Sequence, residues 1–141
     1  MTRPKIAVID GQGAGIGKAL IERLRATYGE KISILALGTN SLATSVMLKA
    51  GADEGATGEN PVVVNAERVD VIMGAIGILA ADSMLGELTP PMAQAIGKSP
   101  AWKILIPLNK CQLHVAGLKN VPFASYIDEA IATVAERYPA H

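Results

Sequence analysis

Aromatic residues and long hydrophobic runs are both scarce in this chain. Phenylalanine, tryptophan and tyrosine make up 4% of its 141 residues, although 50% of all residues are hydrophobic. The core is therefore expected to be aliphatic. The least polar stretch, residues 71–81, holds about eleven residues between Asp70 and Asp82, whereas a transmembrane helix needs roughly twenty. These features predict a single globular domain over residues 1–141 and no contact with a membrane.

The chain also has a single cysteine and no excess of positive or negative charge. Cys111 is the only cysteine, which excludes an intramolecular disulfide and favours a reducing compartment. Lys plus Arg and Asp plus Glu each total 13, so the net charge is zero and the basic cluster of a nucleic-acid-binding protein is missing. The first residues lead into a strand too short for a secretory signal. We expect a cytoplasmic protein, and its balanced charge and high apolar content favour a homo-oligomer.

What the chain does have is an apolar strand that leads directly into a glycine-rich loop. Residues 6–9 (Ile-Ala-Val-Ile) have the continuous hydrophobicity of a buried parallel strand. The loop reads Gly11, Gln12, Gly13, Ala14, Gly15, Ile16 and Gly17. Helical periodicity is clear from Lys18 onward, so the loop leads into a helix N-terminus. There, free N–H groups and the helix dipole favour a phosphate.

The spacing of the glycines distinguishes between two loop patterns. A Gly-x-Gly-x-x-Gly pattern that starts at Gly11 fails, because its last position is Ile16. The pattern Gly-x-x-x-Gly-x-Gly fits Gly11, Gly15 and Gly17. A plain tight turn between a strand and a helix also uses glycine, and this alternative stays open. The position of the loop after the first strand predicts that residues 11–17 bind a nucleotide or a dinucleotide such as NAD or NADP.

Strand and helix patterns alternate along the whole chain. Strands are expected at residues 5–9, 31–37, 61–65, 69–73, 103–107 and 112–116. Helices are expected at residues 14–28, 41–50, 77–86 and 124–138, and a further short helix is expected to begin after Thr89 and to end before Gly97. Residues 53–60 read as a loop. The apolar strands predict an α/β fold: a three-layer Rossmann-like domain with a mostly parallel sheet of about five or six strands and helices on both faces.

Two further segments are expected at the carboxyl edge of this sheet, where such folds bind their ligands. Thr39 and Asn40 follow the second strand, and they either bond an adenine ribose or cap the next helix. No acid or arginine stands beside them to select NAD or NADP. Gly74, Ala75 and Gly77 follow the fourth strand. These small residues either leave room for a sugar or nicotinamide ring or simply form a tight turn.

Two stretches of the chain resemble the cofactor-binding half of short-chain dehydrogenases. Residues 11–17 are similar to the Gly-x-x-x-Gly-Ile-Gly loop of that family, with Asp10 in place of the usual Thr or Ser. Residues 69–78 resemble its fourth strand. The catalytic Tyr-x-x-x-Lys pair of the family is absent, so the resemblance implies the fold and the cofactor class but not the chemistry. The chain as a whole resembles a small bacterial family of Rossmann-like proteins of unknown function.

The candidates for a nucleophile or a metal site are weak. Cys111 and His114 follow the fifth expected strand, close to Asn109 and Lys110, and could form an activated thiol. In a strand, however, residues three apart point to opposite faces, and a lone cysteine is usually buried. Two ligands do not make a metal site, so none is predicted.

The acidic residues offer structural roles more readily than catalytic ones. Asp82 and Glu87 are either acid–base groups in the cleft or hydrogen-bonded structural groups. Three further acids are expected to be solvated: Asp53, Glu54 and Glu59. Asp10, beside the glycine-rich loop, is expected to accept hydrogen bonds from the amides of the loop and to fix its shape. No catalytic residue is assigned.

These observations predict a small nucleotide-binding protein that acts as a sensor or as a subunit. Two alternatives stay open. One is a compact enzyme whose site is completed between copies of the chain by Asp82, Asn109, Lys110 or Cys111. The other is a non-catalytic interaction protein in which the glycine-rich loop only shapes the fold.

Overall fold

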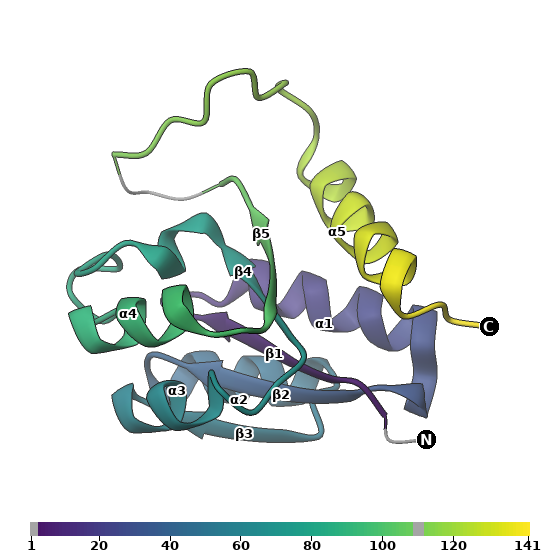
Figure 1. The fold of residues 1–141 in the computed structure, drawn as a ribbon, viewed down its shortest axis with the longest axis horizontal. Helices are drawn as coiled ribbons and strands as arrows, with labels where there is room; N and C mark the ends of the chain where they lie inside the picture. Colours follow the sequence, from purple (N-terminus) through teal and green to yellow (C-terminus); the bar gives the residue numbers. More distant parts are fainter. Residues whose placement is uncertain (1–2, 109–111) are drawn as a thin grey trace.

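The computed structural model describes residues 3–108 and 112–141. Its strands form one open, parallel, five-stranded sheet in the order β3-β2-β1-β4-β5 (Figure 1). The strands are β1 (Lys5–Asp10), β2 (Ser33–Gly38), β3 (Glu54–Thr57), β4 (Val71–Ala75) and β5 (Trp102–Ile106). The predicted fold class is confirmed. This strand order is the one that Rossmann folds use, and it places the topological switch point between β1 and β4.

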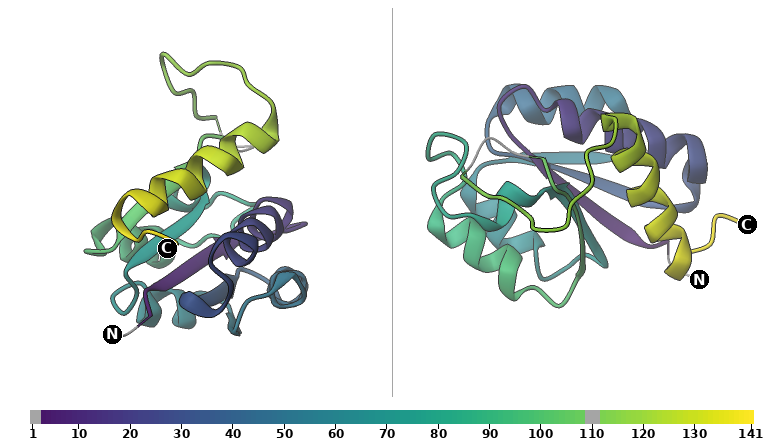
Figure 2. Two further views of the ribbon diagram at one scale, coloured as in Figure 1. Left: turned by 90° about the vertical axis from the view of Figure 1, so that its right-hand side faces the viewer. Right: turned by 90° about the horizontal axis from the view of Figure 1, so that it is seen from above.

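Helices cover both faces of the sheet, as Figure 2 shows from two sides. The α-helices are α1 (Gly15–Tyr28), α2 (Ser41–Ala50), α3 (Glu59–Asn65), α4 (Pro90–Lys98) and α5 (Phe123–Arg137), and two short 3₁₀ helices are η1 (Gly29–Lys31) and η2 (Ile76–Leu79). One core joins α1, α2 and α5 to the sheet, and a second core joins α3, α4 and η2 to its other face. In the part of the chain described, no helix is long and apolar enough to cross a membrane.

The strand β1 shows how the sequence builds both cores. Ile6 and Val8 belong to the first core, and Ala7 and Ile9 belong to the second. Successive side chains of a strand point to opposite faces, so a central strand covered on both sides must be apolar throughout. All four residues are 0% exposed. The loop that follows β1 is thereby attached to a rigid element.

The third predicted strand is wrong, because residues 61–65 belong to helix α3. Pro61 lies in the first turn of this helix, where a missing N–H costs nothing. Only Val62 of the valine run is fully buried, and its neighbours are half-buried. The strand lies instead at Glu54–Thr57, where a loop was expected. This edge strand is short, largely exposed and polar, so it carries little of the apolar signal that marks a strand.

Two other predicted elements are also wrong. The helix expected at residues 77–86 is limited to η2, and left-handed backbone follows at Asp82, Met84 and Leu85. That conformation is incompatible with an α-helix. Residues 112–116, expected to form a sixth strand, are exposed and have no strand structure. The short helix α4 begins after Thr89 as predicted, but it runs through Gly97 instead of ending before it.

Both ends of the described chain contact η1. Arg3 Nη1 donates to the carbonyl oxygen of Glu30 at 3.1 Å. Lys31 Nζ donates to the carbonyl oxygen of Ala140 at 2.9 Å. Because η1 lies between the C-terminal end of α1 and the start of β2, these contacts are at the amino edge of the parallel sheet.

We predict opposite effects of alanine at two glycines. A Cβ at Gly74 in β4 would lie 2.6 Å from the carbonyl oxygen of Ile9 in β1, and the backbone of a central strand cannot move aside. Gly74→Ala should therefore lower the free energy of unfolding by about 1–3 kcal/mol. A Cβ at Gly97 in α4 would meet open space, so Gly97→Ala should raise it by roughly 0.5–1 kcal/mol. Urea denaturation measures both, and a harmless Gly74→Ala would contradict the strand pairing.

Candidate functional site

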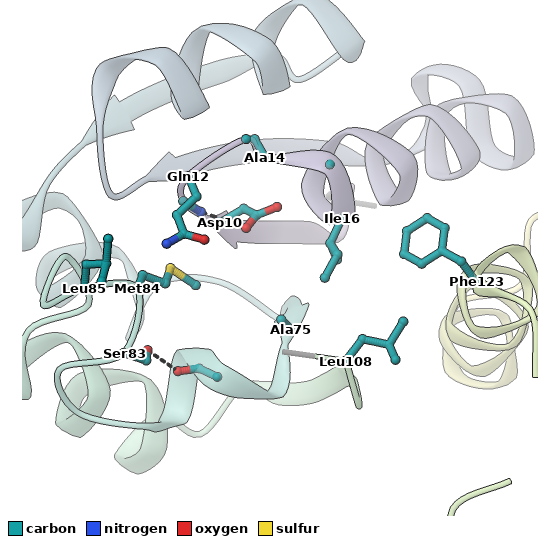
Figure 3. A pocket seen from close by; sticks show the side chains of 14 residues that line it. Asp10, Gln12, Ala14, Ile16, Ala75, Ser83, Met84, Leu85, Leu108 and Phe123 are labelled. Atoms are coloured by element: carbon teal, nitrogen blue, oxygen red, sulfur yellow. Dashed lines mark hydrogen bonds between the residues drawn. The ribbon is translucent and has the colours of Figure 1, made fainter. Parts of the chain in front are cut away.

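A pocket of about 710 Å³ opens at the carboxyl edge of the sheet (Figure 3). This volume lies within the range of roughly 300–1,000 Å³ that is usual for small-molecule sites. The pocket is lined by Asp10, Gly11, Gln12, Gly13, Ala14, Gly15, Ile16, Ala75, Gly77, Ser83, Met84, Leu85, Leu108 and Phe123. Most of the residues predicted from the sequence to bind a cofactor are among them. Four of the predicted residues do not line the pocket: Gly17, Thr39, Asn40 and Gly74.

Asp10 fixes the shape of the glycine-rich loop through two hydrogen bonds. Its Oδ1 accepts the backbone N–H of Gly11 at 2.7 Å, and its Oδ2 accepts that of Gly17, also at 2.7 Å. The predicted role of Asp10 is confirmed. Burial raises the pKa of this carboxyl, and the two amide hydrogen bonds act in the opposite direction. One side chain at the end of β1 therefore joins the first and last glycines of the loop.

The glycines of the loop fall into two groups. A Cβ at Gly11 would collide with Oγ1 of Thr39, and a Cβ at Gly17 would lie 2.7 Å from Sδ of Met47. These two positions are closely packed, so a Cβ at either one would force a neighbouring side chain to move. A Cβ at Gly13 or Gly15 would meet nothing within 4 Å.

The left-handed positions of the loop are not glycines. They belong to Gln12 (φ 48°) and Ala14 (φ 56°), and the N–H of Ala14 donates to the carbonyl oxygen of Gly11 at 2.9 Å. Since Gly13 and Gly15 have neither a left-handed φ nor a close neighbour, the protein itself does not require glycine there. What their missing side chains provide is space beside the pocket.

The start of α1 leaves backbone donors available. The N–H of Gly17 is taken by Asp10, and the N–H of Lys18 donates to the carbonyl oxygen of Ala14 at 2.9 Å. Within the described residues, the N–H groups of Gly15 and Ile16 have no acceptor. No lysine or arginine of the described chain lines the pocket. An anion in this pocket would be held by amides, close to the buried carboxyl of Asp10.

The two ends of the pocket differ in their surroundings. Figure 3 shows Ile16, Leu108 and Phe123 together at one end, contributed by α1, the segment after β5 and the start of α5. At the other end Gln12 faces Met84. The first end is apolar and carries an aromatic ring, so it suits a flat ring of a ligand.

Thr39 and Asn40 are hydrogen-bonded to Glu87, which was not predicted to lie beside them. Oγ1 of Thr39 and Nδ2 of Asn40 both donate to Oε1 of Glu87, at 2.7 and 2.9 Å. These two hydrogen bonds lower the pKa of Glu87. Asn40 also caps α2, because its Oδ1 accepts the N–H of Ala43 at 2.8 Å. The acid missing after β2 in the sequence is thus supplied from a loop 47 residues further along the chain.

The other catalytic candidates do not gather at the pocket. Asp82 and His114 are exposed, and neither lines it. Three further candidates lie outside the described residues: Asn109, Lys110 and Cys111. Over residues 3–108 and 112–141, no group of three or more His, Cys, Asp or Glu residues is arranged to hold a metal ion.

Two of the three acids expected to be solvated have structural partners. Oδ2 of Asp53 accepts the backbone N–H of Ile34 at 2.7 Å and pairs with Arg25 at 2.8 Å. Burial acts to raise the pKa of Asp53, but these contacts lower it overall. Glu59 accepts the hydroxyl of Thr89 at 2.6 Å. All three acids are exposed, as expected, but Asp53 and Glu59 also have hydrogen-bond partners from other elements.

Two of the tyrosines donate structural hydrogen bonds to backbone carbonyl oxygens. The hydroxyl of Tyr28 donates to the carbonyl oxygen of Tyr138 at 2.6 Å, and burial raises the pKa of Tyr28. The hydroxyl of Tyr126 donates to the carbonyl oxygen of Lys119 at 2.7 Å. None of the three tyrosines lines the pocket. Each hydroxyl joins its helix to another segment of the chain.

We predict that Asp10→Asn lowers the free energy of unfolding by about 1–3 kcal/mol, because the amide NH₂ group would leave one loop N–H without an acceptor. The stability contributed by Asp10 also depends on pH. Its pKa in the folded protein is raised above 3.8, so this contribution is complete below pH 3.8 and is lost as the pH rises through the raised value. Urea denaturation at several pH values should show the advantage of the wild type shrinking as the pH rises. An advantage that grows instead would contradict a raised pKa.

Comparisons with known proteins place the chain in a family. No curated protein matches it. Among solved structures, it is similar to a dodecameric FMN-dependent Ubix-like decarboxylase from Escherichia coli O157:H7, with 12% sequence identity and a TM-score of 0.42 over 94% of each chain. A likeness at this level carries no argument about function. A family model described as a domain of unknown function (DUF3842) matches residues 5–139, and the chain therefore belongs to the DUF3842 family.

Proposed function

We propose that this protein binds a nucleotide, with a phosphate on the amides that open α1 and a ring at the apolar end of the pocket. The observation that carries the proposal is the open space at Gly13 and Gly15 beside the N–H groups of Gly15 and Ile16, which have no acceptor among residues 3–108 and 112–141. Backbone that exposes its donors at a helix N-terminus and has no Cβ in the way is what a phosphate needs. The loop also lies at the switch point, where open α/β sheets bind ligands.

The charges around the pocket limit the kind of nucleotide. No described basic side chain lines the pocket, and the buried carboxyl of Asp10 lies beneath the loop. A triphosphate would accumulate negative charge there without a cation to balance it. NAD and NADP, which the loop pattern predicts, and mononucleotides carry fewer linked phosphates, so their charge is easier to accommodate there. The apolar contacts of Ile16, Leu108 and Phe123 then supply much of the binding free energy.

The polar groups of the pocket favour binding over catalysis. Both oxygens of Asp10 accept loop amides, and the hydroxyl of Ser83 donates to the carbonyl oxygen of Gly77 at 2.7 Å. These side chains hold the site together and are not available as acid–base groups. We therefore propose a role as a nucleotide sensor or as a subunit of a larger assembly.

Self-association belongs to this proposal. Several large apolar side chains are exposed on the chain, among them Leu113, Val115 and Leu118 between β5 and α5. Such side chains favour contact with another apolar surface. A homo-oligomer would cover them, and light scattering measures its size.

We predict that Gly15→Val weakens nucleotide binding at least about tenfold, because its branched side chain would occupy the space that a phosphate uses. The fold should survive, since the position has open space and an ordinary φ. Thermal shift and calorimetric titration with NAD, NADP, AMP and FMN measure the effect. A ligand present at a hundred times its Kd stabilises the wild type by about 2.7 kcal/mol.

Gly97→Val is the matched control. Gly97 also has open space, but it lies in α4 and does not line the pocket, so this variant should bind as the wild type does. If Gly15→Val keeps the full affinity for every nucleotide that stabilises the wild type, the phosphate is not held at this loop.

A further inference from the structure

The loop between η2 and α4 folds back on itself and is fixed in place. The N–H of Asp82 donates to the carbonyl oxygen of Leu88 at 2.7 Å, and the N–H of Leu88 donates to that of Ser83 at 3.1 Å. Ser83 is also tied to η2 through its hydroxyl. We refer to residues 82–88 as the covering loop. Its shape is set by these internal bonds and by left-handed backbone at Met84.

The covering loop lies against the end of β2 and the start of the glycine-rich loop. Through Glu87 it accepts hydrogen bonds from Thr39 and Asn40, the first two residues after β2. Through Met84 it reaches Gly11, because a Cβ built on Gly11 would lie 2.8 Å from Sδ of Met84. The covering loop thus lies over the carboxyl ends of β1 and β2.

That region is where a dinucleotide would place its adenosine. In sheets of this strand order, the residues after β2 bond the ribose, and an acid there accepts its hydroxyl groups. Here the donors of Thr39 and Asn40 already serve Glu87, and none of these three residues lines the pocket. The pocket extends the other way, toward Leu108 and Phe123.

We propose, on the basis of the proposed function, that the covering loop occupies the adenosine half of the crevice and restricts the site to mononucleotides. One phosphate would lie on the amides of Gly15 and Ile16, and one ring would lie beside Phe123. Glu87 determines this specificity without touching the ligand, because it holds the covering loop on β2.

The experiment compares each mononucleotide with the dinucleotide that contains it: FMN with FAD, and AMP and nicotinamide mononucleotide with NAD. Calorimetric titration of the wild type should give, for at least one pair, a mononucleotide that binds about tenfold tighter or more. Glu87→Ala should release the covering loop and thereby reduce the ratio of mononucleotide affinity to dinucleotide affinity. Thr39→Val removes one donor with little change in shape, and it tests the same contact if Glu87→Ala fails to fold.

Glu67→Ala is the control, because Glu67 is exposed and does not line the pocket. The ratio of mononucleotide to dinucleotide affinity in this variant should equal that of the wild type. A dinucleotide that binds the wild type as tightly as its mononucleotide would overturn the restriction while leaving nucleotide binding intact. An unchanged ratio in a folded Glu87→Ala or Thr39→Val variant would overturn the role of Glu87. Binding of no nucleotide at all would instead remove the proposed function itself.

Discussion

The pair of hydrogen bonds that Asp10 accepts is the contact on which the site depends. It joins Gly11 at the end of β1 to Gly17 in the first turn of α1, so the strand and the helix are held together through one side chain. A buried carboxyl is costly unless its oxygens are bonded, and here both are. The same bonds use one of the donors at the helix N-terminus and leave the two before it exposed to the pocket. The shape of the loop and its capacity for an anion therefore have one origin.

The glycine-rich loop shows that one motif can serve two needs. Gly11 and Gly17 allow close approach between parts of the protein, and Gly13 and Gly15 leave space outside it. Only the second kind concerns a ligand. The sequence pattern does not separate the two kinds, since each glycine looks alike until its neighbours are known.

Much of the fold could be predicted because its signals are local. The apolar residues of β1 and the role of Asp10 follow from their neighbours in the chain. The errors arose where distant contacts decide the outcome. Residues 61–65 are helical despite their valines, and β3 exists only through its pairing with β2. Glu87 could not be placed beside Thr39 from the sequence, because 48 positions separate them and three of the left-handed residues of the covering loop are not glycines.

The contacts of η1 with both ends of the described chain have a practical consequence for handling the protein. Arg3 and Ala140 both bond to this short helix, at the edge of the sheet opposite the glycine-rich loop (Figure 1). A linker that joined Arg3 to Ala140 would therefore run along this edge of the sheet and would not cross the pocket. For the same reason, attachment of the protein to a surface through residues at this edge would leave the mouth of the pocket facing the solution.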